Sequence, residues 1–188
     1  MTAPAWPGLV AQLDAHVAHD AVEARDLTRL QALARTDRPW DRSQPVHVTG
    51  SAVVVHPPSR RILLRWHERM AGWYQVGGHG DPGEDEPFAV ALREGREETG
   101  LDDLVPWPDA DRPELVHVVV VPVPAGKGEP AHEHADLRFA LATDRPDAAR
   151  PETATAPLRW LSIPEALDLV AEDNLCETLR RIGAVLDG

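Results

Sequence analysis

A short stretch near the middle of the chain, residues 93 to 100, constrains fold and function more than any other. It reads REGREETG and contains the glutamates Glu94, Glu97 and Glu98. Residues three and four apart share one face of a helix, so a helix here would project all three carboxylates to one side. The sequence favours a helix from about residue 87 to residue 99, because Pro87 suits a first helical turn and Gly100 suits a helix end.

Three carboxylates on one helical turn repel one another, and their pKa values would rise unless a cation lay among them. Magnesium suits such a cluster, because it is a hard ion that binds carboxylate oxygens and substrate phosphates. The plain alternative is a solvated acidic face, with Arg93 and Arg96 relieving the repulsion. For a helix of this composition taken alone, we would favour that alternative.

The segment directly upstream favours a metal site over a solvated acidic face. Residues 77 to 84 read GGHGDPGE, so a short strand runs into paired glycines that leave backbone room for a phosphate or a metal. The whole run from Gly78 to Leu101 resembles the signature of the Nudix hydrolases. In that signature a glycine precedes a glutamate, and an arginine-glutamate pair, two further glutamates and a glycine follow.

The run departs from the family pattern at two positions. Glu84 lies at the family's spacing from Gly78, but eight residues instead of seven separate it from Arg93. Either the loop carries a one-residue insertion, or Asp85 replaces the glutamate with His79 at the place of the glycine. We favour the insertion, because a loop absorbs it more easily than a helix. The second departure is Gly95, which stands where the pattern has an apolar side chain.

The resemblance implies a hydrolase that uses water to cleave a pyrophosphate bond in a nucleotide or nucleoside diphosphate derivative. It implies Mg2+, with Mn2+ as the alternative, bound by Glu94, Glu97, Glu98 and the Gly78 carbonyl. Arg93 would orient Glu84 or Glu97 through a charged pair. The base that takes the proton from water varies in the family. It would be a signature glutamate, Glu97 or Glu98, or a residue of a later loop, for which Glu133 in HEHAD is the candidate; a solvated polar loop is the alternative there.

Three further residues are candidates for binding the substrate. His79 follows the glycine pair and could contact phosphate, although a structural role in the loop fits as well. Tyr74 could stack on a nucleobase, but aromatic residues on short strands are more often part of the core. Arg65 could bind phosphate, although an ordinary salt bridge is the simpler reading. His132 and His134 are further metal-ligand candidates outside the signature.

Apolar patterns on either side of the signature predict a layered α+β domain. Residues 7 to 35 read as two short helices, with Val10, Leu13 and Val17 on one apolar stripe. Strands are expected at 47–56, 60–67, 73–79, 115–124, 135–143 and 156–163, and helices at 164–173 and beyond. With the resemblance, this predicts a Nudix-like mixed sheet between helices over residues 45–188, preceded by a helical extension and linker over residues 1–44.

Composition restricts the classes of molecule that the protein is expected to bind. A net charge of -12 argues against general nucleic-acid binding, but not against a small phosphorylated substrate that is bound through a cation. No apolar run is long enough to suggest a membrane span, and the single cysteine, Cys176, suits a reducing cytoplasm. A homodimer is conceivable because many relatives pair. The alternative function is a catalytically silent Nudix-like domain that binds a nucleotide or a protein.

Overall fold

The computed structural model describes residues 5–126 and 128–188. Two helices, α1 (Pro7–Ala15) and α2 (Ala21–Ala34), precede a sheet of eight strands. The strands are β1 (Val46–His56), β2 (Arg61–His67), β3 (Gly72–Tyr74), β4 (Val76–His79), β5 (Val105–Pro106), β6 (His117–Val123), β7 (His132–Ala142) and β8 (Leu158–Leu161). The remaining α-helices are α3 (Pro87–Thr99), α4 (Ile163–Leu169) and α5 (Asp173–Asp187), and short 3-10 turns lie at Pro57–Ser59 and Pro146–Ala148.

Strand β1 is the centre of the sheet. It pairs in parallel with β7, from Val46 opposite Glu133 to Val55 opposite Ala142. Its other edge is shared by two antiparallel neighbours, with β4 along the first half and β2 along the second. The sheet is therefore mixed, as the sequence predicts, and β4 brings the paired glycines against the middle of β1.

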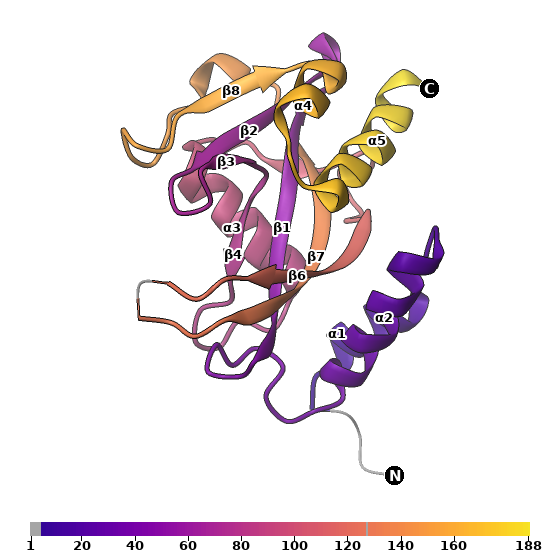
Figure 1. Cartoon of the computed structure of the whole chain (residues 1–188). Helices are drawn as coiled ribbons and strands as arrows, with labels where there is room; N and C mark the ends of the chain where they lie inside the picture. Colours follow the sequence, from indigo (N-terminus) through magenta and orange to yellow (C-terminus); the bar gives the residue numbers. More distant parts are fainter. Residues whose placement is uncertain (1–4, 127) are drawn as a thin grey trace.

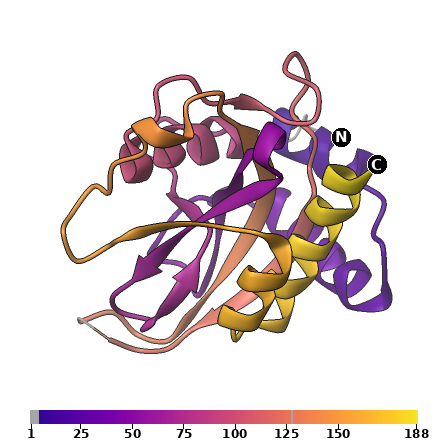
Figure 2. The ribbon, with the colours of Figure 1, turned by 90° about the horizontal axis from the view of Figure 1, so that it is seen from above.

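Helices cover both faces of the sheet, as Figures 1 and 2 show. Val53 and Val55 of β1 pack on one face into a core with α4 and α5, around Leu175 and Leu179. Ala52 and Val54 point to the opposite face, because side chains alternate along a strand. There they join a second core with Ala91 of α3 and with leucines of α1 and α2: Leu9, Leu13, Leu27 and Leu30. The expected mixed sheet between helices is confirmed.

The N-terminal helices also close an edge of the sheet. The Glu23 and Asp26 side chains of α2 are buried and accept hydrogen bonds from the backbone N–H groups of Val118 and Val120, both at 3.0 Å. These amides belong to β6, whose other edge pairs with β7. Carboxylates thus satisfy strand groups that would otherwise need another strand or water.

Several element boundaries differ from the expectation. The strand expected at 73–79 is interrupted at Gln75 and forms β3 and β4. Strand β7 begins at His132, inside the segment that the sequence favours as a loop, because its first residues pair with both β1 and β6. The stripe through Val17 was wrong: α1 ends at Ala15, and Val17 is 80% exposed. In the described part of the chain, no helix is both long enough and apolar enough to cross a membrane.

Candidate active site

The three glutamates of the signature lie on α3, as expected, but in different surroundings. The Glu98 side chain is 8% exposed and lines a cavity of about 560 Å³. Glu94, one turn earlier, is 17% exposed, whereas Glu97 is 55% exposed. Among the three, Glu98 is the one that contributes to the cavity wall.

Two groups from the sheet hold the Glu98 carboxylate. The Arg65 guanidinium of β2 lies 2.6 Å from Oε1, and the backbone N–H of Gly77 donates to Oε2 at 3.0 Å. Burial nevertheless dominates and raises the pKa of Glu98 to about 7. Burial also raises the pKa of Glu94 above its ordinary value, while Arg93 opposes the rise. Ionisation of either carboxylate thus carries a desolvation cost that a bound cation would offset.

The paired glycines let β4 lie close to both β1 and α3. Gly77 has a φ of 150°, a backbone conformation that other residues rarely adopt, and a Cβ there would lie 2.3 Å from the Ser51 Cβ. A Cβ on Gly78 would lie 2.4 Å from Oε1 of Glu94. The backbone of β4 therefore touches the metal-ligand candidates directly, because no side chain intervenes.

Arg93 organises the loop that leads into α3. Its guanidinium donates to both oxygens of Glu84, with Nη2 to Oε2 at 3.0 Å, and to the backbone oxygen of His79 at 2.8 Å. Nη1 also reaches Glu94 and Glu97, each at 3.0 Å. These contacts raise the pKa of Arg93 and lower that of Glu84. Glu84 is therefore the partner of the arginine, in agreement with an insertion between Glu84 and Arg93.

Gly95, the second departure from the pattern, faces the core. A Cβ at this position would lie 3.1 Å from methyl carbons of both Leu104 and Leu141. Those leucines occupy the space that an apolar side chain of the helix would fill. The departure is thus a matter of packing against these two leucines.

A buried polar network forms the floor of the cavity. Thr49 and Ser51 of β1 donate to the two oxygens of Asp136 on β7, at 2.9 and 2.7 Å. Arg138 donates to the same carboxylate at 2.9 Å and is only 2% exposed. It continues to Thr178 and Asn174 of α5. With its hydrogen bonds already made, Asp136 acts as a fixed polar wall of the cavity.

The sequence interpretation did not single out this network as a unit. Its signal lies in the alternation within β1, where His47, Thr49 and Ser51 precede Val53 and Val55 on the same face. One face of the strand is thus polar at its beginning and apolar at its end. Such a change from polar to apolar residues on one face of a buried strand indicates where the hydrophobic core ends and a polar site begins.

The three substrate-binding candidates all line the cavity. The Tyr74 hydroxyl donates to Glu172 at 2.7 Å, and its pKa is raised, first by burial and then by that carboxylate. Arg65 is engaged with Glu98, as described above. His79 belongs to a group of histidines at one end of the cavity, together with His134 at 3.2 Å between Nε2 atoms.

Glu133, the candidate base from the later segment, is not brought to the cavity. The residues on either side of it, His132 and His134, line the cavity. Glu133 itself points to the opposite face, because it alternates with them along β7. There it pairs with Arg29 of α2, with 2.5 Å between Nη2 and Oε2. Its place in strand β7 rather than in a loop leaves it no freedom to swing over the signature.

The donors on and beside α3 fit a hard divalent cation. Glu94, Glu97 and Glu98 offer carboxylate oxygens, and Glu94 lies so close to Gly78 that a Cβ there would be 2.4 Å from Oε1. The Gly78 carbonyl stays a predicted further ligand. A cation would also relieve the desolvation that raises the pKa of Glu94 and Glu98. Arg93 bridges Glu94 and Glu97, so it keeps these two side chains near each other before any ion binds.

Comparisons with known structures agree with this fold. A Caenorhabditis elegans Ap4A hydrolase aligns with a TM-score of 0.58 at 21% identity, over 75% of this chain and 98% of that one. The Escherichia coli dihydroneopterin triphosphate pyrophosphohydrolase aligns with a TM-score of 0.56 at 19% identity, over 76% of this chain and 97% of that one. The NUDIX domain of Shewanella oneidensis NrtR, complexed with ADP ribose, aligns with a TM-score of 0.56 at 16% identity, over 83% of this chain and 97% of that one.

Comparison with curated protein sequences gave no significant match. The model of the NUDIX domain, in contrast, matches residues 46–181 and so covers most of the chain, including β1, the paired glycines, α3 and most of α5. The chain therefore belongs to the NUDIX domain family.

Proposed function

We propose that this protein is a divalent-metal-dependent hydrolase that cleaves a pyrophosphate bond in a nucleotide or a nucleoside diphosphate derivative. The observation that carries the proposal is the position of Glu98. It is a buried carboxylate on the signature helix, it faces a cavity of about 560 Å³, and it is held by Arg65 and by the Gly77 amide. The donor set favours Mg2+, with Mn2+ as the alternative.

The substrate class follows from the cavity and from the relatives. The similar proteins are an Ap4A hydrolase, a dihydroneopterin triphosphate pyrophosphohydrolase and a NUDIX domain complexed with ADP ribose. All three of these compounds contain a phosphoanhydride. A cavity of this volume matches a ligand of nucleotide size. Tyr74 and Trp66 supply aromatic surface in its wall, and Arg42 and Arg69 supply positive charge. These four residues are the proposed contacts for the parts of the substrate that do not react.

Each residue of the site has a defined task in the proposed reaction. Glu94, Glu97 and Glu98 hold the cation, which neutralises phosphate charge and makes water more acidic when it is bound. Arg93 keeps the loop with Glu84 against the start of the helix. Arg65 favours the ionised form of Glu98 at a place where burial opposes it.

The proton of the attacking water passes, on this proposal, to a carboxylate of α3 and not to Glu133. Glu98 is the member of that helix that lines the cavity, so it is the first candidate. Glu97 is the second, because it is exposed and shares the Arg93 guanidinium with Glu94. Water attacks phosphorus, the phosphoanhydride bond breaks, and two phosphate-bearing products leave.

The experiment is phosphate release from a panel of nucleotides and nucleoside diphosphate conjugates, with Mg2+ and a coupling phosphatase. Glu98→Gln is measured alongside, because it keeps the shape of the side chain and removes its charge. We expect turnover of one compound class and loss of that turnover in the variant. Melting shifts with the same compounds but no turnover would support a binding domain instead and would contradict the proposal.

A further inference from the structure

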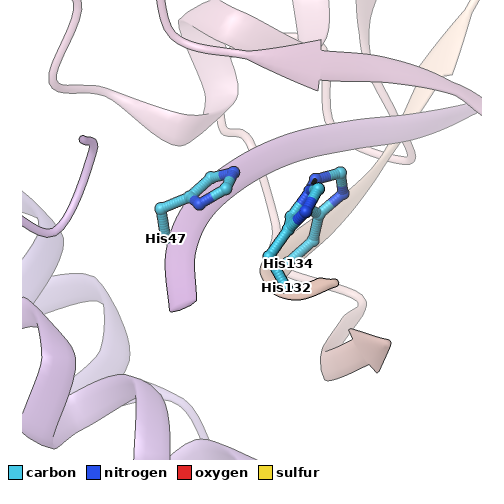
Figure 3. A group of neighbouring side chains, drawn as sticks. All are labelled: His47, His132 and His134. Carbon is cyan, nitrogen blue, oxygen red and sulfur yellow. Dashed lines mark hydrogen bonds between the residues drawn. The ribbon is translucent and has the colours of Figure 1, made fainter. Parts of the chain in front are cut away.

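Four histidines meet where β1, β4 and β7 begin or end, next to the candidate active site. His47 lies directly opposite His134 in the parallel pairing of β1 and β7, and His79 lies opposite Thr49 in the pairing of β1 and β4. His132 is two residues before His134 and therefore points to the same face of the sheet. Figure 3 shows His47 on one strand with its ring turned toward His132 and His134 on the next.

The Nε2 atoms of these rings lie close to one another. Nε2 of His79 lies 3.0 Å from Nε2 of His47 and 3.2 Å from Nε2 of His134. Nε2 of His132 lies 3.2 Å from Nε2 of His134. Ligand atoms of His47, His132 and His134 all fall within 4.8 Å of one another.

Backbone carbonyls fix the tautomer of two of these rings. Nδ1 of His47 lies 3.1 Å from the Gln44 oxygen, and Nδ1 of His132 lies 2.9 Å from the Pro130 oxygen. A carbonyl oxygen only accepts, so both rings carry their proton on Nδ1 and leave a lone pair on Nε2. A hydrogen bond from the distal nitrogen to a carbonyl is also how proteins orient histidines that bind metals.

With neutral rings, the three Nε2 contacts cannot all be hydrogen bonds. The contact between His47 and His79 needs a proton on Nε2 of His79, and the contact between His132 and His134 needs one on Nε2 of His134. The contact between His79 and His134 would then place two N–H groups against each other. In any neutral arrangement that keeps the carbonyl bonds of His47 and His132, at least one of the three contacts is repulsive.

An extra proton does not resolve this conflict favourably. It would place a positive charge directly against neighbouring rings whose Nε2 atoms lie 3.0 to 3.2 Å away. A single cation that accepts a lone pair from each ring removes every repulsive contact at once.

We propose that His47, His79, His132 and His134 form a binding site for one divalent transition-metal ion of the zinc type, through their Nε2 atoms. In a tetrahedral site with Zn–N bonds of about 2.0–2.1 Å, neighbouring nitrogens lie about 3.3 Å apart. The distances of 3.0 and 3.2 Å between the Nε2 atoms are close to that edge length. Among His47, His132 and His134, the widest separation of ligand atoms is within 4.8 Å, and rotation of the rings would bring these atoms to the tetrahedral spacing.

This site is chemically distinct from the carboxylates of α3. Imidazole nitrogens suit zinc, copper, iron and nickel, whereas carboxylate oxygens suit magnesium and manganese. The ion would tie the first residues of β1 and β7 to the end of β4. The ion would also restrict the motion of the signature loop, because the His79 backbone oxygen accepts a hydrogen bond from Arg93 at 2.8 Å. We therefore assign the ion a structural role at the mouth of the cavity.

The test is metal binding by the full chain without a histidine tag, after treatment with a chelator. Zn2+ is titrated against a competing chelating dye, and Co2+ is used as a spectroscopic probe. We expect one equivalent of tightly bound Zn2+ and the visible absorption of tetrahedral Co2+, which an oxygen-rich octahedral site does not give. Failure of the wild type to compete with the dye would overturn the proposal.

Matched variants locate the ion. His132→Gln removes one ligand at a partly exposed position, and we expect Zn2+ affinity to fall by more than about tenfold. His56→Gln is the control, because His56 bonds Ser59 outside the cluster. Glu98→Gln should leave Zn2+ affinity unchanged, which separates this site from the proposed active site. His134→Asn is a second ligand variant, should His132→Gln not fold. Unchanged affinity in the folded ligand variants, or a loss in Glu98→Gln, would contradict the assignment.

Discussion

Arg65 and Glu98 form an ion pair in the wall of the cavity, with 2.6 Å between Nη1 and Oε1. Burial raises the pKa of Glu98 and Arg65 lowers it, and the balance lies at about 7. The arginine therefore decides how much of the carboxylate is ionised near neutral pH. This relationship connects a strand residue to the proposed metal site.

Replacing Arg65 with methionine should weaken Mg2+ binding at neutral pH and leave it nearly intact at alkaline pH. Without the guanidinium the pKa of Glu98 rises further, so the carboxylate is protonated over a wider range and competes less well for the ion. The measurement is Mg2+ affinity against pH for wild type and variant. Arg61→Met is the control, because Arg61 is exposed on the same strand. If the pH profiles of Arg65→Met and wild type were parallel, Arg65 would not control the ionisation of Glu98.

The loop insertion gives a matched pair of variants. Glu84→Gln should lower the free energy of unfolding by about 1–2 kcal/mol, because it removes a charged partner from Arg93. Asp85→Asn, one residue later, should have little effect, since Glu84 already occupies the guanidinium. Denaturant unfolding of both variants shows whether Glu84 or Asp85 is the partner of Arg93. The opposite order of effects would place Asp85 in the family's glutamate position.

Helix α3 could be predicted from sequence to the residue, whereas the site around it could not. The bounds at Pro87 and Thr99 depend on local signals, a proline at the start and Gly100 in the left-handed conformation after the end. Strand β7 lacks such a signal at its start. Its first residues are strand because β1 and β6 lie on either side, and those partners are distant in sequence. Treating residues 132–134 as a loop left the direction of Glu133 unconstrained.

The histidine cluster shows the same limit. His47, His79 and His134 come from three strands, and only the register of the sheet brings them together. From the sequence, the spacing within HEH can indicate His132 and His134 as a pair of metal ligands, but it cannot identify His47 or His79 as their neighbours. The signature, in contrast, is read along a single segment, which is why its carboxylates and the Arg93 contacts could be anticipated.

Glu133→Gln should leave turnover within about twofold of wild type. Glu133 faces Arg29 and not the cavity, so its loss removes one partly exposed ion pair. Loss of a true general base would slow the reaction by at least about 100-fold. The rate is measured at saturating Mg2+ on the substrate that the panel identifies. Arg29→Gln should give the same small effect, and a large loss confined to Glu133→Gln would restore it as the base.

Gly78→Ala should weaken Mg2+ binding by about tenfold or more while the protein remains folded. The new methyl group would lie 2.4 Å from Oε1 of Glu94 and must push that flexible side chain aside. Metal affinity and melting temperature are measured together. Gly126→Ala is the control, because the nearest neighbours of its added carbon belong to the Arg69 side chain, at 3.4 Å or more, and not to a signature glutamate. Unchanged affinity in Gly78→Ala would separate Glu94 from the metal site.

His117 should make the folded state sensitive to acid. It is buried at 4% exposure, and Nδ1 lies 2.9 Å from the Thr178 hydroxyl. Burial lowers its pKa to about 3, and the nearby Arg138 and Arg181 act in the same direction, while Glu23 opposes them. The neutral ring is therefore the form that the fold accepts.

The sign of the effect follows from linkage. In the unfolded chain His117 titrates near 6.5, so below that pH the unfolded state binds a proton that the native state does not. Its contribution to stability is fully present above pH 6.5 and is lost as the pH falls toward 3, by up to about 1.4 kcal/mol per pH unit. His79 and His134 act in the same direction in the metal-free protein. Urea unfolding of wild type and His117→Gln between pH 7 and pH 4 tests this, with a shallower pH slope expected for the variant. Equal slopes would show that His117 does not contribute.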